Sequence, residues 1–467
     1  MPPIFSQCRI RPLLMTTSKL VLLATVFCLF NVRLQGQEPD SRGAEAIKAV
    51  IEGKKLIDQG TAVSSRQAII KFEEALKIVR ETKDVFREAS ILAVIADVYN
   101  SLGEHQKALD YLKQAIPLMH TTGDQGSEAL LLSLAGNIQS AGGEKQKALE
   151  LYQAALPILR ALKDTDGEAK TLNNLGAVLA DLDRVDEAFQ AYQQALTLRK
   201  NLHDTDGQSE TLMNMGLAYF ALGDYQKALD AYAQSLPIME KATDKGGEVR
   251  LLIAVGLAHK FIGDQSKALD FFNRALSLGT SIGDRAAQMS ALINIGSIHN
   301  ESKENPEAIQ CYERALSIAK QLGDKAGISR TQVNLGNAYE ETGEVQKALD
   351  LYNEALPIMR ALGDRNGEAG ALGAIGILMA KRGDKQKAQS FLEQSLDLLK
   401  TTGDLRAQAK ALRDIAFLMS DRGELNAASQ KIESALTLVE SLVDDIQTKT
   451  IRPNSLLLLR IITTASI

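Results

Sequence analysis

Apolar and polar residues alternate along most of this chain with the spacing of amphipathic helices. Residues 124–163 are a representative stretch, in which two apolar sets each follow a spacing of three and four residues. This period of about 3.6 predicts two helices, each with one buried face. Gly142 and Gly143 separate the two sets, and glycine supplies the backbone conformations that a tight turn between helices requires. The apolar sets are Leu131, Leu132, Ala135 and Ile138, followed by Ala148, Leu149, Tyr152, Ala155, Leu156 and Leu159.

The pattern of these two helices recurs every 40 residues. A fixed period of 20–50 residues indicates one supersecondary unit that is copied and stacked. Copied units form a long surface, whereas catalysis usually needs one unrepeated cluster of groups. Two series keep the period: Ala108, Ala148, Ala188, Ala228, Ala268, Ala308, Ala348, Ala388 and Ala428, and Asp84, Asp124, Asp164, Asp204, Asp244, Asp284, Asp324, Asp364 and Asp404.

The repeated aspartate follows the break between one unit and the next, as in Gly283-Asp284, Gly323-Asp324 and Gly363-Asp364. The glycine suits the position after the end of a helix, and the aspartate suits the N-cap of the next helix. A metal site is the alternative, but one carboxylate per unit places neighbours about 10 Å apart, the usual distance between packed helices. We therefore interpret the series as helix caps and expect no metal site.

A small residue recurs in each first helix, and a bulky one in each second helix. Small residues allow two helix backbones to approach closely, and we expect an aromatic ring to fill the space between units. We call the first series the small-residue row: Ala96, Gly136, Gly176, Gly216, Gly256, Gly296, Gly336, Gly376 and Ala416. The second is the aromatic row: Phe72, Tyr152, Tyr192, Tyr232, Phe272, Tyr312 and Tyr352, with Leu112 and Leu392 at the same place in two units.

These two rows and their helix–turn–helix spacing resemble the tetratricopeptide repeat (TPR). The resemblance covers roughly residues 43–443, with a unit of 40 rather than 34 residues, as in kinesin light chain. Leu132 and its equivalents stand where the family often has tryptophan. The resemblance implies an all-α fold, a right-handed α-solenoid of about ten TPR helix pairs with a concave groove lined by the first helices.

Both ends of the chain depart from the repeat. Residues 1–36 contain Arg9, Arg11 and Lys19, no acidic residue, and an apolar run from Leu20 to Phe30. This pattern predicts a signal peptide or an N-terminal anchor, with Met15 as an alternative start. We therefore expect export to a bacterial periplasm or tethering to the membrane there, with a cytoplasmic location as the alternative. We expect residues 37–443 to form one TPR solenoid and residues 444–467 an irregular, disordered tail.

Motifs of catalysis and cofactor binding are missing from the sequence. Residues 279–283 fit the spacing of a nucleophile elbow, but they lie at the end of a predicted helix rather than in a strand-to-helix turn. His259 and His299 occupy matching places in adjacent first helices, where packing is the simpler interpretation than metal binding. Cys311 is the single cysteine after residue 36, so no disulfide is expected in the mature chain. We expect no enzyme activity, no cofactor and no small-molecule substrate.

The net charge argues against nucleic acid as a partner. It is −5 for the whole chain, and it becomes −9 without the four basic residues of 1–36. An acidic surface with few aromatic residues is a poor match for a phosphate backbone.

Polar residues on the first helices are the candidate binding residues. Asn174, Asn214, Asn294 and Asn334 lie two residues before the small residue, and Lys170, Arg250 and Arg330 lie six before it. Residues four apart share a helix face. In TPR proteins these places resemble groove positions whose asparagines hold a peptide backbone and whose basic residues hold carboxylates. The alternative is that they only solvate a helix face.

The sequence therefore predicts a non-catalytic scaffold that binds a protein or peptide segment of acidic character in the concave groove. The array also resembles the TPR half of bacterial proteins that join TPRs to a caspase-like CHAT domain. The alternative function is accordingly the regulatory part of such an effector, truncated before its catalytic domain. A membrane is expected as a partner only through residues 1–36.

Overall fold

A computed structural model describes residues 41–449, and every regular element within this range is a helix. The predicted signal segment, residues 1–36, lies outside the described residues. Among the described helices, none is long and apolar enough to cross a membrane. The described chain divides into two compact units at residues 247 and 248, inside one helix, and the single domain expected over 37–443 spans both. Each unit is described separately below.

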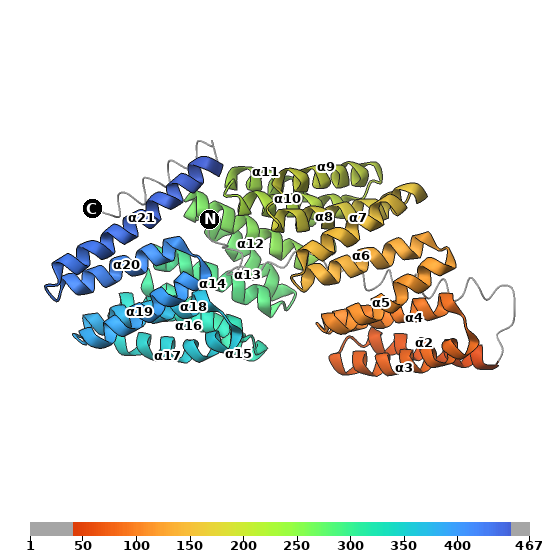
Figure 1. Ribbon diagram of the computed structural model, residues 1–467, viewed down its shortest axis with the longest axis horizontal. Coiled ribbons are helices and arrows are strands. Elements are labelled where there is room, and N and C mark those ends of the chain that lie inside the picture. The colour runs from red at the N-terminus through yellow and green to blue at the C-terminus, as the bar shows by residue number, and fades with distance from the viewer. Residues whose placement is uncertain (1–40, 450–467) are drawn as a thin grey trace. The chain divides into compact units, whose positions relative to one another are not determined.

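The N-terminal unit contains five antiparallel helix pairs (Figure 1). The second helix of each pair follows the first after a short turn. The helices are α2 (Ser41–Asp58), α3 (Ala62–Thr82), α4 (Val85–Ser101), α5 (His105–Thr122), α6 (Gln125–Ala141), α7 (Lys145–Leu162), α8 (Thr165–Asp181), α9 (Val185–Asn201), α10 (Thr205–Ala221) and α11 (Tyr225–Met239).

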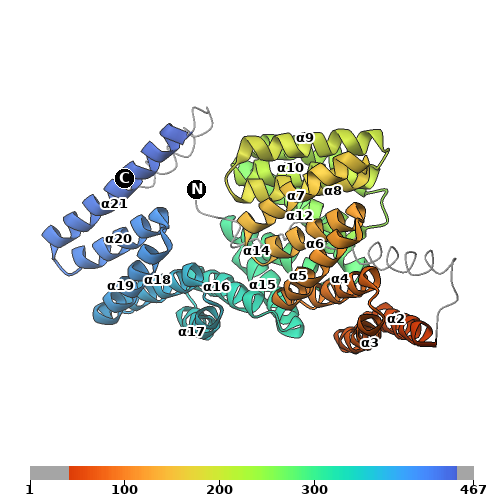
Figure 2. The ribbon, with the colours of Figure 1, turned by 45° about the vertical axis from the view of Figure 1, so that its right-hand side comes forward.

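The C-terminal unit contains the other five pairs (Figure 2). They are α12 (Lys245–Ile262), α13 (Gln265–Ser281), α14 (Arg285–Glu301), α15 (Asn305–Leu322), α16 (Lys325–Glu341), α17 (Val345–Leu362), α18 (Arg365–Lys381), α19 (Lys385–Thr402), α20 (Leu405–Ser420) and α21 (Leu425–Lys449). The ten pairs confirm the predicted all-α repeat fold. The last helix runs through Lys449, so residues 444–449 are helical where the sequence predicted the start of an irregular tail. Residues 450–467 of that tail lie outside the described residues.

Close contact between the small-residue row and the aromatic row holds each pair together. A Cβ atom added to Gly136 would lie 2.6 Å from Cε1 of Tyr152, and one added to Gly336 would lie 2.6 Å from Cε1 of Tyr352. Both distances are too short for real carbon atoms. Both rings are fully buried, and the second-helix alanines from Ala108 to Ala388 have no exposed surface, whereas Ala428 in the last pair is 8% exposed. The close approach predicted at the small-residue row is therefore confirmed, and the ring contacts the first helix of its own pair, whereas the sequence analysis placed it between units.

The aspartate series caps the first helices, as the sequence predicts. Asp324 Oδ1 accepts a hydrogen bond from the backbone N–H of Gly327 at 3.0 Å, and Asp164 Oδ1 accepts one from Gly167 at 2.9 Å. The same bond is made by Asp84, Asp124, Asp204, Asp244, Asp284, Asp364 and Asp404. Gly323 precedes its aspartate with φ at 65°, in the left-handed region that ends a helix.

We predict that Asp324→Ala lowers the free energy of unfolding by about 1 kcal/mol, because the first turn of α16 loses its side-chain acceptor. Chemical denaturation measures this change. Asp270→Ala is the matched control, since Asp270 is exposed and lies within α13 rather than at a helix start. Equal effects of the two substitutions would contradict the capping role.

Candidate binding surface

In each unit several neighbouring first helices contact one another and form a layer, α6 to α10 in the N-terminal unit and α14 to α20 in the C-terminal unit. In the N-terminal unit α8 contacts both α6 and α10, and in the C-terminal unit α16 contacts both α14 and α18. We call the accessible side of this layer the inner face. We use this name for the helix face that carries the positions six and two before the small residue, which lie together because they are four residues apart. Each predicted site residue therefore lies on a first helix, in the row that the sequence assigned to it.

Three predicted site residues belong to the N-terminal unit, and they differ in exposure. Lys170 is exposed on α8, and its Nζ pairs with Asp166 Oδ2 of the same helix at 2.6 Å. Asn174 is half-buried, and Asn214 on α10 is only 5% exposed. An exposed ion pair such as Lys170–Asp166 contributes little to stability, so Lys170 can change partners at small cost.

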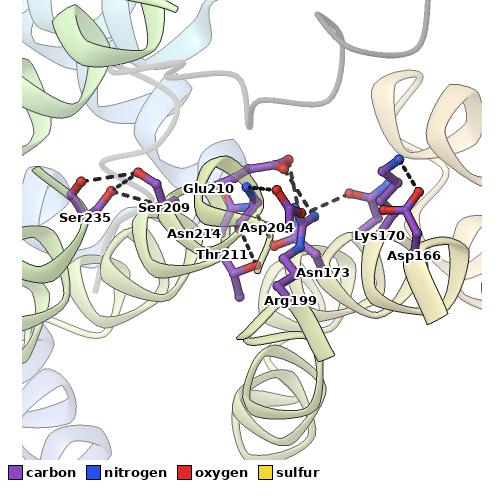
Figure 3. A network of polar contacts seen from close by, with 12 residues as sticks. Asp166, Lys170, Asn173, Arg199, Asp204, Ser209, Glu210, Thr211, Asn214 and Ser235 are labelled. Atoms are coloured by element: carbon purple, nitrogen blue, oxygen red, sulfur yellow. Dashed lines mark hydrogen bonds and ion pairs between the residues drawn. The ribbon is translucent and has the colours of Figure 1, made fainter. Parts of the chain in front are cut away.

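Asparagine side chains form a continuous hydrogen-bonded chain across three first helices. Asn174 Nδ2 on α8 donates to Asn137 Oδ1 on α6 at 2.9 Å, and the Tyr152 hydroxyl donates to the same oxygen at 2.6 Å. Asn173 Nδ2 donates to Asn174 Oδ1 at 3.3 Å. Asn214 Nδ2 on α10 donates to Asn173 Oδ1 at 3.1 Å (Figure 3). The two predicted asparagines of this unit are thus joined through Asn173, which the sequence analysis did not identify.

A buried arginine lies beside this chain. Arg199 on α9 is 3% exposed; its Nη1 lies 3.2 Å from Asp204 Oδ2, and its Nη2 lies 3.2 Å from Glu210 Oε2. Glu210 also accepts a hydrogen bond from Asn173 Nδ2 at 3.4 Å, which links the ion pairs to the asparagines (Figure 3). A side chain at position 207 would collide with the guanidinium, so Gly207 provides the space that Arg199 occupies.

The sequence analysis did not identify Arg199 or Glu210, although each residue differs from those at the equivalent place in other units. Arg199 stands in a row that is otherwise apolar or small: Val79, Met119, Leu159, Met239, Gly279, Ala319, Met359 and Leu399. Glu210 occupies on α10 the place that Lys170 occupies on α8. Burial raises the pKa of the Glu210 carboxyl above its usual value, and the neighbouring Arg199 opposes this shift only in part.

The remaining four predicted residues belong to the C-terminal unit, and all are half-buried. Asn294 Nδ2 donates to the Ser290 carbonyl of its own helix at 2.9 Å, so it does not join a neighbouring helix as Asn174 does. Asn334 lies on α16, one turn after Arg330, and Arg250 lies on α12. The structure thus brings Arg330 and Asn334 together on one helix, whereas Asn174 and Asn214 are connected between helices.

The inner face offers hydrogen-bond capacity through its asparagine amides. The Asn174 amide donates once and accepts once in the network, which leaves one N–H and one lone pair for a ligand. Within residues 41–449 no group of three His, Cys, Asp or Glu side chains could hold a metal ion. The His259 ring stacks on Phe271 with centroids 5.5 Å apart, which fits the packing interpretation. Burial raises the pKa of the Cys311 thiol and so lowers its reactivity.

We predict that Arg199→Met lowers the free energy of unfolding by about 1–3 kcal/mol, because Glu210 loses its cationic partner in a largely buried place. Methionine fits this row, since Met239 and Met359 occupy it in other units. The loss should be smaller at pH 4 than at pH 8. A carboxyl whose pKa is raised by folding contributes most when protonated, and it loses stability as the pH rises through that pKa.

The double variant Arg199→Met/Glu210→Gln is the control for this prediction. It removes the unpaired carboxylate, so denaturation at pH 8 should show recovery of most of the lost stability. If the double variant is as unstable as Arg199→Met alone, the loss comes from packing and not from the ion pair.

Comparisons with known proteins give a consistent result. A tetratricopeptide-repeat model matches residues 167–241, 207–281 and 287–361, and a second such model matches 89–118. A model of anaphase-promoting complex subunit 5 matches residues 62–97. A comparison with curated protein sequences found no match.

Several solved structures share the fold at low sequence identity. A signal-transduction ATPase with a tetratricopeptide-repeat sensor from Pyrococcus horikoshii is 15% identical, with a TM-score of 0.56 over 91% of this chain and 69% of that one. The apo quorum sensor NprR from B. thuringiensis is 15% identical, with a TM-score of 0.54 over 73% and 98%. Apo RapI is 16% identical, with a TM-score of 0.50 over 59% and 99%. The repeat models, the 40-residue helix pairs and these folds agree: the chain belongs to the tetratricopeptide-repeat proteins.

Proposed function

We propose that this chain is a non-catalytic scaffold that binds an extended segment of a protein or peptide on the inner face of its first helices. The observation that carries the proposal is the row of asparagine amides from Asn137 through Asn174 to Asn214. Amide groups that both donate and accept match the backbone of an extended chain, which presents N–H and C=O groups in alternation.

The asparagine network supports binding because it fixes the side chains before a ligand arrives. Asn174 is held at both its oxygen and its nitrogen, so little rotamer entropy is left to lose on binding. Asn214 Oδ1 is buried and accepts no hydrogen bond within the described structure. A buried acceptor without a donor is costly, and a ligand N–H that reaches it would remove that cost.

The strongest support for an acidic ligand comes from the charge of one row of side chains in the C-terminal unit. The row six residues before the small residue contains Arg250, Ser290, Arg330, Gly370 and Lys410 there, with no carboxylate. In the N-terminal unit the same row contains Ser90, Leu130, Lys170 and Glu210, so it has no net charge. We therefore assign the preference for acidic residues to the inner face of α12, α16 and α20, which carry Arg250, Arg330 and Lys410, and a sequence-tolerant backbone contact to α6, α8 and α10.

Two further proposals rest on the sequence. Export is supported by the basic and apolar composition of residues 1–36. The alternative function, the regulatory part of a truncated CHAT-type effector, is supported by the resemblance of the array and by the break in the repeat after residue 443.

We predict that replacing Asn294, Arg330 and Asn334 together by alanine weakens partner binding at least fivefold, which corresponds to about 1 kcal/mol for the lost hydrogen bonds. Folding should change less than binding, because the three side chains are half-buried polar groups and none belongs to the apolar core. Isothermal titration with a partner captured by the full chain measures the binding, and denaturation measures the folding.

The matched control replaces Gln310, Arg314 and Ser317 by alanine. These residues are exposed on one face of α15, a second helix, and they include one cation and two polar side chains, as the test variant does. Unchanged binding by the test variant together with lost binding by the control would place the ligand on the second helices and overturn the proposal.

A further inference from the structure

Within the described residues, no following helix pair covers the outer face of the last pair, α20 and α21, as a successor covers each inner pair. Leu436 on α21 is 48% exposed, whereas Leu356 and Leu396 at the same place in the two preceding second helices are 6% and 5% exposed. Ile432 and Val439, which lie within one turn of Leu436, are half-buried, while their equivalents Leu392 and Leu399 are buried. The second helix of the last pair therefore carries the apolar face of an inner unit.

The first helix of the last pair contributes to the same surface. Phe417 on α20 is 63% exposed. It occupies the place of Asn137, whose side chain contacts Asn174 on the first helix of the following pair. Phe417 thus points to where a following pair would lie. We call Phe417, Ile432, Leu436 and Val439 the end face. A terminal repeat usually has a polar outer side, so this apolar end face indicates that something covers it.

We propose that residues 454–462 of this chain fold back onto the end face and cover it. This segment contains four consecutive leucines, Leu456 to Leu459, followed by Ile461 and Ile462. It is long enough to reach its target. Leu436 lies about 20 Å along α21 from Lys449, and the 18 residues that follow Lys449 in the sequence span up to about 60 Å when extended.

Charge complementarity supports this occupant. Glu433 and Glu440 are exposed and flank Leu436 on α21, three residues before it and four after it. Residues 450–467 contain Arg452 and Arg460 and no acidic residue. Arg460 stands in the middle of the apolar run, so it can pair with either glutamate while the leucines contact the end face.

Covalent attachment favours the tail over a second copy of the chain. A short flexible tether gives an effective concentration in the millimolar range. A second copy would have to reach that concentration in solution to compete equally. The tail is therefore the occupant of the end face in a dilute monomer.

The test compares the full chain with a full-length variant in which Leu456, Leu457, Leu458 and Leu459 are replaced by serine. Hydrogen exchange of the backbone amides of residues 425–441 should become at least tenfold faster in the variant, because α21 loses its cover. Exchange in α14–α17 should stay unchanged, which shows that the array is still folded. Thr463→Ser/Thr464→Ser is the control, because it alters the same tail outside the leucines.

A second variant, Leu436→Ser, removes the other side of the same contact. Its effect on exchange in α21 should resemble that of the tail variant, and combining the two should add little. The proposal is overturned if the tail variant leaves exchange in residues 425–441 unchanged. A second outcome also overturns the proposal: the full chain sediments as a dimer, Leu436→Ser dissociates that dimer, and the tail variant leaves it intact. In that case a second copy of the chain covers the end face.

Discussion

Close approach between a glycine and a ring is the constraint on which the rest of this structure depends. The backbone of each first helix lies against a side chain of its partner helix so closely that a methyl group at Gly136 or Gly336 would overlap the tyrosine ring. Residue sizes at the two places compensate in most pairs. The pairs with alanine in the small-residue row, at Ala96 and Ala416, have aliphatic Leu112 and Ile432 opposite them, and Gly376 is the exception because it faces Leu392. A small residue against a bulky one in each pair keeps the spacing of the paired helices similar.

Because the geometry within pairs is constant, residues at equivalent positions of successive pairs can form one binding surface. When every unit repeats the same packing, equivalent positions on successive first helices lie side by side, and side chains 37 to 41 residues apart come into contact. The bonds from Asn174 to Asn137 and from Asn214 to Asn173 are contacts of this kind. A row of amides on a stable layer is suited to a repetitive ligand such as a peptide backbone. The end face is the other consequence, because the last copy of a stacked unit has no successor.

The sequence predicts the fold well because each element is repeated and each signal is local. The helix pairs, the aspartate caps and the close approach at the small-residue row follow from spacing and residue size, and the structure confirms them. The contact between each glycine and the ring of its own pair was not predicted. The polar network was predicted only in part, because the 40-residue period gives the row of a residue and not its partner. Asn173 differs from Asn174 by one position, yet it joins α8 to α10 whereas Asn174 joins α8 to α6. Arg199 departs from an apolar row, and its partners become apparent only when α9 and α10 are placed together.

A double-mutant cycle at Gly336 and Tyr352 tests the central constraint most directly. In the natural chain, Gly336→Ala should lower the free energy of unfolding by about 1–3 kcal/mol, because the new methyl group overlaps the Tyr352 ring. In the Tyr352→Leu background the same substitution should be neutral or stabilising, because alanine favours a helix over glycine by about 1 kcal/mol once the ring is gone. The measurement is chemical denaturation of all four proteins. An equal effect of Gly336→Ala in both backgrounds would show that the ring does not set the distance between the helices.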